Sequence, residues 1–186
     1  AAVGAAAGKG KITRETIQDP TYERHVSIGF NYRLPELCAA VALAQLERLS
    51  ELVALRVEAA RLYQQAVAGC TWVTPQATPA DYVHSYWTYV AHLAPDVDFS
   101  WYDFRNKYKE LGGDGIYAAW QLNYLEPAFR QVRFAPEQTQ TFERGICPVA
   151  EAVQPRLLQF KTNYFDLDVA AQKAEVLAKT IAYFGG

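Results

Sequence analysis

The amino-acid sequence predicts an α+β (α/β) fold, in which helices cover one face of a small, mostly antiparallel sheet. Three observations predict it. Residues 35–68 carry the longest run of apolar residues at helical spacing. Residues 71–93 then change to short runs rich in aromatic and β-branched residues. Helical spacing returns over 99–111 and toward the end of the chain, which makes the element order helix, strands, helix, strand and helices.

The run from Pro35 to Ala68 predicts one very long amphipathic helix, or two helices with a bend. Pro35 is suited to the first helical position and Gly69 to the stop. At about 1.5 Å per residue the run would reach roughly 50 Å, which is more than a small domain needs. Such a helix connects two domains or packs against a partner.

Shorter patterns predict the remaining elements. Residues 71–73 and Ser85–Leu93 predict strands because they are aromatic and β-branched. Residues 99–111 predict a helix that begins after a Ser100 cap and ends at Gly112. The last predicted elements are a strand over 115–120, helices over 136–144 and 150–160, and a helix over 169–184 with Asp168 as its cap.

The composition excludes several classes of protein. With 186 residues, of which 51% are hydrophobic and 20% charged, the chain can form a packed core and is not a disordered protein. A net charge of −2 gives no electrostatic reason to expect nucleic acid or a membrane surface as a partner. No uncharged apolar run is long enough to span a bilayer. Cys38, Cys70 and Cys147 are widely spaced, which predicts buried, reduced thiols in a cytoplasmic protein.

The histidines do not indicate a metal site. If His84 and His92 lay on one strand, they would share a face but lie about 26 Å apart, too far to bind one metal ion. We expect His92 to be structural, whereas His84 has either a structural or a functional role. No arrangement typical of a hydrolase is present, and Gly112–Gly115 is a helix stop rather than a phosphate-binding loop.

The segment Gly29–Glu36 carries the densest group of side chains that could bind a ligand or take part in a reaction. Asn31 can donate to a phosphate oxygen, and Arg33 can bind a carboxylate or phosphate with two parallel hydrogen bonds. The helix that follows would favour an anion at its start. The alternative, which the residues support equally well, is a capping loop whose Asn and Arg bond to local backbone.

Four segments resemble a known family when they are taken together. They are residues 29–40 continuing into 44–49, residues 84–87, residues 126–129 and residues 147–151. They look, in order, like the patterns G-[FY]-N-x-R-x-x-E-x-x-A-A with a following A-Q-L helix, H-S-[YF]-[WH], Q-P-A-[YF] (with Glu126 in place of the glutamine) and C-P-x-A-E. These patterns are those of the DegT/DnrJ/StrS family of pyridoxal-phosphate-dependent aminotransferases, most of which aminate keto sugars.

The resemblance implies that the chain is the C-terminal portion of a fold-type I transferase. Residues 1–33 would then be a remnant of the large domain and an interface loop, 34–69 the connecting helix, and 70–186 the small C-terminal domain. The lysine that forms the Schiff base with pyridoxal phosphate lies in the family well ahead of the G-[FY]-N-x-R motif. Lys9 and Lys11 are too close to Asn31 to take its place, so the chain alone is not expected to transaminate.

The resemblance also assigns roles to individual residues. Asn31 matches the family asparagine that contacts the cofactor phosphate of the neighbouring subunit, which implies a homodimer. Tyr32, Arg33, His84 and Tyr117 are then expected to bind substrate. Where many members carry a G-I-x-x-x-x-H-Y-x-P-L-H loop, residues 115–124 lack the histidines. This departure suggests a different amino acceptor or a divergent branch.

Three functions remain open. The chain is part of an enzyme that transfers an amino group from an amino acid such as glutamate to a nucleotide-linked keto sugar; the missing initiator Met and the Ala-rich start favour this hypothesis. It is alternatively a non-catalytic dimerisation or interaction module. A third hypothesis is that it complements a separate chain that supplies the lysine. Apolar surface left exposed along the connecting helix would cause self-association or poor solubility.

Overall fold

The computed structural model describes residues 13–23, 25, 29–30, 32, 34–131, 135, 137 and 141–186. The chain forms two compact units. Unit 1 comprises residues 1–33 and 117–155, and unit 2 comprises residues 34–116 and 156–186. Each unit therefore combines segments that are far apart in the sequence.

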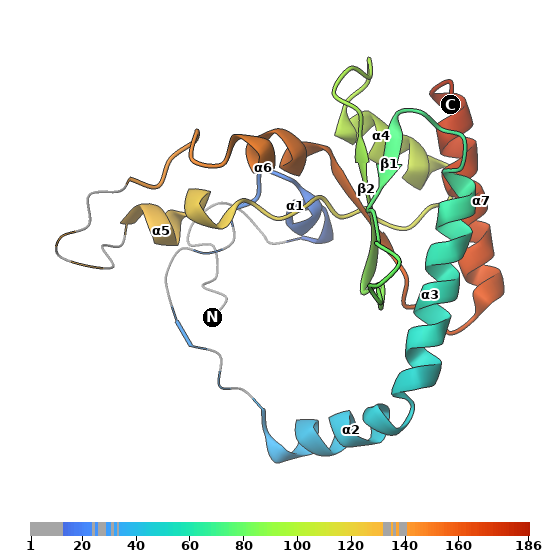
Figure 1. Ribbon diagram of the computed structural model, residues 1–186, viewed down its shortest axis with the longest axis horizontal. Coiled ribbons are helices and arrows are strands. Elements are labelled where there is room, and N and C mark those ends of the chain that lie inside the picture. Colours follow the sequence, from blue (N-terminus) through green and yellow to red (C-terminus); the bar gives the residue numbers. More distant parts are fainter. Residues whose placement is uncertain are drawn as a thin grey trace. The chain divides into compact units, whose positions relative to one another are not determined.

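Unit 2 contains a three-stranded antiparallel sheet in the order β1-β2-β3 (Figure 1). The strands are β1 (Val73–Pro75), β2 (Thr88–Leu93) and β3 (Leu157–Lys161). Val73 pairs with Leu93, and Tyr89 pairs with Phe160. Along β2 every second residue is buried, because successive side chains of a strand point to opposite faces. One face of the sheet therefore carries the core, as the sequence predicts.

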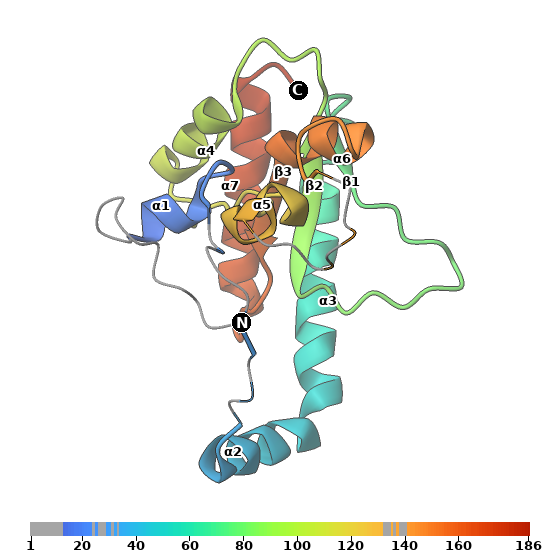
Figure 2. The ribbon, with the colours of Figure 1, turned by 90° about the vertical axis from the view of Figure 1, so that its left-hand side faces the viewer.

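Helices cover this buried face. They are α3 (Leu49–Ala66), α4 (Trp101–Glu110) and α7 (Leu167–Tyr183), and α7 packs along both of the others (Figure 1, Figure 2). Tyr63 of α3 is fully buried; its ring stacks on Tyr89 at 5.5 Å and lies 5.4 Å from Phe160. The α+β prediction is confirmed.

A buried chain of hydroxyl groups adds directional contacts to this apolar core. The hydroxyl of Tyr63 lies 3.3 Å from that of Tyr164, which donates to the Asp114 carboxylate at 2.6 Å. Lys173 of α7 forms an ion pair with the same carboxylate at 3.5 Å. Burial raises the pKa of Tyr63 and of Tyr164, so both hydroxyls stay protonated and available as donors.

The long helical run is two helices, as the second alternative predicts. Helix α2 (Glu36–Glu47) ends at Arg48, where the chain bends sharply into α3 (Figure 1). Pro35 is the N-cap of α2 rather than its first helical residue. The predicted helix stop at Gly69 is confirmed for α3. The last helical residue of α3 is Ala66, and Gly69, three residues later, has a φ of 86°.

The α4 prediction is confirmed in detail. The Ser100 hydroxyl accepts from the Asp103 N–H at 3.2 Å, while the Asp103 carboxylate accepts from the Ser100 N–H at 2.9 Å. This reciprocal capping box satisfies two donors at the helix start. Gly112 ends the helix with a φ of 96°, and a Cβ at Gly113 would lie 2.2 Å from the Tyr108 ring. Position 113 therefore has no room for a side chain.

Several sequence predictions are wrong in detail. The predicted helix over 150–160 ends early, because Pro155 interrupts it and Leu158 and Phe160 are buried in alternation on β3. The strand predicted from residue 85 begins only at Thr88. Residues 115–120 form no strand, and 141–144 are not helical, whereas most of 136–140 lies outside the described residues. The last helix begins after Asp166 rather than Asp168.

Unit 1 contains short helices joined by loops. They are α1 (Arg14–Gln18), η1 (Asn123–Leu125), α5 (Pro127–Gln131) and α6 (Pro148–Val153), followed by the turn η2 (Gln154–Arg156), whose last residue belongs to unit 2. The buried Gln154 amide donates to the carbonyls of Pro20 and Ala119, both at 3.0 Å. One side chain therefore holds the N-terminal segment to the segment that follows residue 117.

The cysteine prediction is partly wrong. Cys38, Cys70 and Cys147 are free thiols, but Cys38 and Cys147 are exposed and Cys70 is half-buried. Cys38 is exposed because α2 has no buried residue, and Cys147 because it precedes a short surface helix. Among the described residues, no helix has the length and apolar character needed to cross a bilayer.

Helix α2 exposes apolar side chains on every side. Only Glu36, Gln45 and Glu47 of its residues are polar, and none of its residues is buried. Leu37 is 77% exposed, and Val41, Leu43 and Leu46 are each more than half exposed. A helix that is apolar all round is normally covered by other protein. The structure thus supports the expectation of self-association.

We predict that the chain associates with itself through α2. Light scattering at increasing protein concentration should give a mass above 20.8 kDa, and replacing Val41 and Leu46 with lysine should shift the mass toward that of one chain. Substitution of the exposed Val83 in unit 2 by lysine is the matched control and should have no such effect. A single-chain mass for the unaltered protein at all concentrations would contradict the prediction.

Candidate functional site

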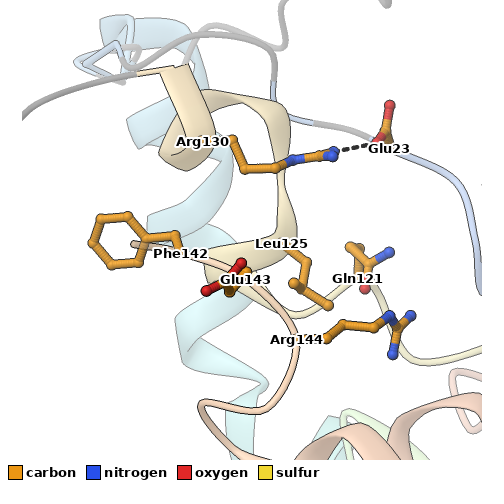
Figure 3. Close-up of a pocket in the computed structure, with 7 residues that line it drawn as sticks. All are labelled: Glu23, Gln121, Leu125, Arg130, Phe142, Glu143 and Arg144. Atoms are coloured by element: carbon orange, nitrogen blue, oxygen red, sulfur yellow. Dashed lines mark hydrogen bonds and ion pairs between the residues drawn. The ribbon is translucent and has the colours of Figure 1, made fainter. Parts of the chain in front are cut away.

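A cavity of about 310 Å³ lies within unit 1. Four segments form it: the end of the α1 loop, the residues around η1, helix α5 and the loop before α6. Figure 3 shows its lining residues, which are Glu23, Gln121, Leu125, Arg130, Phe142, Glu143 and Arg144. Its lining combines charged side chains, an amide and two apolar side chains.

The charges around the cavity differ in their pairing. Arg130 forms an ion pair with Glu23, drawn as a dashed line in Figure 3. The Glu143 carboxylate accepts one hydrogen bond from the Thr141 hydroxyl at 3.0 Å. Within the part of the chain that the structure describes, no residue accepts a hydrogen bond from the Arg144 guanidinium. Arg144 therefore keeps its donors available to a bound molecule.

A carboxylate next to the cavity fixes the loop that carries Arg144. Glu151 of α6 accepts from the Tyr124 hydroxyl at 2.5 Å, from the Gly145 N–H at 2.8 Å and from the Cys147 N–H at 3.4 Å. The bond to Tyr124 is the main reason that the pKa of Glu151 is lowered, with further contributions from the two backbone donors and from the charge of Arg144. Burial and the bond to Glu151 raise the pKa of Tyr124 to about 12.

A second carboxylate fixes the segment that precedes the predicted interface loop. Glu126 is 1% exposed, and its carboxylate accepts from the His25 N–H at 3.1 Å and lies 3.1 Å from His25 Nδ1. The Ala128 N–H donates to the His25 carbonyl at 2.9 Å. Three contacts therefore hold His25 to the η1–α5 turn.

The structure describes three of the five predicted site residues. Asn31 and Arg33 lie outside the described residues. Tyr32 is 87% exposed and stacks on Phe30 with ring centroids 5.5 Å apart. Tyr117 is partly exposed between the buried Ile116 and Ala118. Tyr32 and Tyr117 belong to unit 1 and His84 to unit 2, so the three are not residues of one unit.

His84 lies in the loop before β2 and supports an unusual backbone conformation. Tyr86 has a φ of 47°, which a residue with a bulky side chain adopts only under constraint. The Tyr86 N–H donates to His84 Nδ1 at 2.8 Å, and the two rings stack at 4.0 Å. Because Nδ1 accepts, the neutral ring carries its proton on Nε2, which donates to the Gln76 side-chain oxygen at 3.3 Å. Local contacts therefore fix the position of the His84 ring.

The described residues do not complete a pyridoxal-phosphate site. The cofactor needs a lysine beside its aldehyde carbon, but the five described lysines all lie in unit 2 and outside the cavity. Lys107 pairs with Glu110, Lys179 with Glu175, and Lys173 with Asp114. Lys161 lies over the Tyr164 ring, and Lys109 also has an interaction partner. No described group of His, Cys, Asp and Glu side chains could hold a metal ion either.

Sequence reasoning missed the cavity. Glu23 lies about a hundred positions before the other lining residues, and no local spacing relates it to Arg130 or Arg144. The sequence held only an indirect indication of the cavity: Glu126 and Glu151 both lie in segments that carry the family resemblance. Their carboxylates fix the two loops that border the cavity.

Comparison with known proteins gives a family match and several similar structures. The model of the DegT/DnrJ/EryC1/StrS aminotransferase family matches residues 8–172. A curated relative, GDP-perosamine synthase of Vibrio cholerae, is 25% identical over 134 residues, which are 71% of this chain and 33% of the relative. The chain thus spans about a third of the length of this relative.

Solved structures of aminotransferases share the fold. An aminotransferase from Psychrobacter cryohalolentis superposes with a TM-score of 0.69 at 21% identity, over 88% of this chain and 42% of that one. DesV of S. venezuelae, solved with a ketimine intermediate, superposes with a TM-score of 0.65 at 19% identity, over 82% and 38%. At these identities the likeness concerns the fold alone.

We predict that Tyr124→Phe raises the pKa of Glu151 toward its ordinary value, because it removes the main cause of the lowered pKa. A lowered carboxyl pKa stabilises the folded state above the unfolded-state pKa, and this stabilisation is lost as the pH falls through the folded-state pKa. The variant should therefore begin to lose stability at a higher pH. Titration of the Glu151 carboxyl carbon by NMR measures the shift. Tyr82→Phe in unit 2 should leave it unchanged.

We predict that His84→Ala releases Tyr86 from its positive φ. Loss of the ring removes both the acceptor and the stacking partner, and a constrained conformation that costs about 1–3 kcal/mol is no longer compensated. The N–H to Hα coupling of Tyr86 and the exchange rate of its amide proton report the change. His92→Ala is the control, since that ring contacts only the Leu93 carbonyl among the hydrogen bonds described. An unchanged Tyr86 coupling in His84→Ala would contradict this account.

Proposed function

Because this chain belongs to the DegT/DnrJ/EryC1/StrS aminotransferase family, we propose that it is part of an enzyme that uses pyridoxal phosphate to aminate a keto sugar. The amino donor is an amino acid such as glutamate, and the sugar is linked to a nucleotide. The family match over residues 8–172 is the observation that carries this proposal. The similarity to GDP-perosamine synthase supports a sugar as the acceptor.

The proposal includes a division of the complete enzyme. The chain spans only 33–42% of the length of the relatives described above. We assign it to the C-terminal portion, with 34–69 as the connecting segment and 70–186 as the small domain. The Schiff-base lysine then belongs to the remainder of the enzyme, while Lys9 and Lys11 lie outside the described residues. Bound pyridoxal phosphate supplies the electron sink for amino transfer.

The proposed roles of individual residues follow the family. Asn31 binds the cofactor phosphate of the neighbouring subunit in a homodimer, and Tyr32, Arg33, His84 and Tyr117 contact the substrate. The exposure of Tyr32 leaves its hydroxyl available for such a contact. The clamp between His25 and Glu126 fixes the backbone six positions before Asn31. The free thiols are consistent with our proposal that the enzyme is cytoplasmic.

A second candidate is a non-catalytic dimerisation module derived from the same family. The observation that favours it is α2, whose exposed apolar side chains fit a protein contact without any chemistry. The two candidates differ in the complete protein. An enzyme must carry pyridoxal phosphate on a lysine, whereas a module has no need of the cofactor.

Subunit mixing tests the proposed function in the complete protein encoded by the gene that contains this sequence. One variant carries Asn31→Ala, and the other lacks the cofactor lysine that borohydride reduction and mass spectrometry identify. If Asn31 serves the neighbouring subunit, each variant alone should be nearly inactive, and mixed dimers should regain activity because one of their two sites is intact. Amino transfer from glutamate to a nucleotide-linked keto sugar is the readout.

Each result separates the candidates. Recovery on mixing supports both the enzyme and the shared site. A complete protein that gains no absorbance or borohydride-stable adduct with pyridoxal phosphate would contradict the proposed function and favour the module. Cofactor binding without recovery on mixing would reject the role of Asn31. The 186-residue chain, treated in the same way, should form no stable adduct.

A further inference from the structure

We propose that Asp114 is a positioning residue for Tyr117, the partly exposed tyrosine three positions after it. The Asp114 carboxylate is anchored by side chains of unit 2, and this anchor sets the path of the chain that leads to Tyr117. The inference deepens the proposed function and rests on it only for the role of Tyr117 as a substrate contact. The family resemblance assigns no role to Asp114 or to the residues that hold it.

Two side chains hold the Asp114 carboxylate. The Tyr164 hydroxyl donates to one of its oxygens at 2.6 Å, and the Lys173 ammonium lies 3.5 Å from the other. Both partners are themselves fixed. The Tyr164 hydroxyl lies 3.3 Å from that of the fully buried Tyr63, and Lys173 also donates to the Gly112 carbonyl at 2.7 Å. Because hydrogen bonds to a charged acceptor are stronger than neutral ones, the carboxylate is held firmly on two sides.

The backbone around Asp114 has little conformational restraint of its own. Residues 112, 113 and 115 are glycines, and residues 113–116 belong to no helix or strand. Glycine adopts φ and ψ values that other residues rarely adopt, so Gly115 leaves several directions open to the chain. Ile116 is fully buried, but apolar contacts are not directional and do not orient the backbone. The Asp114 carboxylate supplies directional contacts to this segment.

The direction of the Tyr117 side chain depends on its backbone. The residue is 36% exposed, and in the part of the chain that the structure describes no hydrogen bond or ring contact involves its side chain. After Tyr117 the chain is fixed within unit 1, where the Ala118 N–H donates to the Gln18 carbonyl at 3.2 Å. Before Tyr117, the anchored Asp114 provides the corresponding restraint. The ring is therefore oriented by a carboxylate three positions away.

NMR on the full 186-residue chain with labelled tyrosine rings tests the anchor without cofactor or substrate. Asp114→Ala removes the carboxylate, and the double variant Tyr164→Phe, Lys173→Met removes both of its partners. In each case the Tyr117 ring signals should shift, and its Hα–Hβ couplings should move toward averaged values because the side chain samples several rotamers. In Asp114→Asn the amide oxygen still accepts from Tyr164, so these changes should be smaller.

Controls show whether a change at Tyr117 is specific. Lys179→Ala removes another ion-paired lysine of α7 and should leave Tyr117 unchanged. The Trp101 indole N–H, which donates to the Leu157 carbonyl, reports that α4 and the sheet stay folded. If Asp114→Ala fails to fold, the double variant decides the outcome. Unchanged Tyr117 couplings in the folded variants that lack the anchor would overturn the inference.

A cycle of variants in the complete protein tests whether Asp114 acts through Tyr117. Asp114→Ala and Tyr117→Ala should each raise the KM for the keto sugar roughly fivefold, as expected for the loss of one hydrogen bond, with a smaller change in kcat. The variant with both changes should be no worse than Tyr117→Ala alone, because the anchor then has nothing to position. Effects that multiply would indicate a merely structural role and overturn the inference.

The two experiments separate this inference from the proposed function. If the complete protein binds no pyridoxal phosphate, the proposed function fails, and the NMR comparison alone decides whether the anchor orients Tyr117. If the complete protein is active but Asp114→Ala and Tyr117→Ala act independently, the positioning role fails and the proposed function stands.

Discussion

The burial of Tyr63 between α3 and the sheet is the constraint on which unit 2 depends. Its ring contacts Tyr89 of β2 and Phe160 of β3, and its hydroxyl leads through Tyr164 to Asp114 and Lys173. One side chain therefore joins the helix, two strands and the loop before α7. Loss of an aromatic ring at such a position costs on the order of 3–5 kcal/mol. The register of β2 and β3 follows, because a shift of one residue would turn Tyr89 and Phe160 to the other face.

Unit 1 is held together by different forces. Its helices are short, and three polar side chains, Glu126, Glu151 and Gln154, accept or donate hydrogen bonds to backbone groups of loops. Polar contacts of this kind specify loop positions more narrowly than apolar packing does. The cavity is formed by the loops that these side chains fix. Its geometry therefore depends on a few directional bonds rather than on a large core.

The sequence predicted what depends on local pattern and failed where distant residues decide. The Ser100 cap and the Gly112 stop are encoded within a few positions, so these predictions hold. Leu157–Lys161 is apolar enough for either a helix or a strand, and only its pairing with β2 decides the matter. The cavity brings Glu23, from the first segment of unit 1, beside residues of the second segment, 117–155. No spacing in the sequence reveals this proximity. The family resemblance, in contrast, needed only short motifs and is confirmed.

The bend at Arg48 divides the helical run into two helices that differ in how well packing protects them from local unfolding. Helix α3 unfolds only when the sheet loses its cover, whereas α2 buries nothing and can open without exposing any core. Its backbone is therefore open to proteolytic cleavage in a molecule that is otherwise folded. Chaperones and proteases that recognise apolar segments would meet α2 first. Among the described helices of unit 2, α2 is thus the one whose opening uncovers no buried side chain.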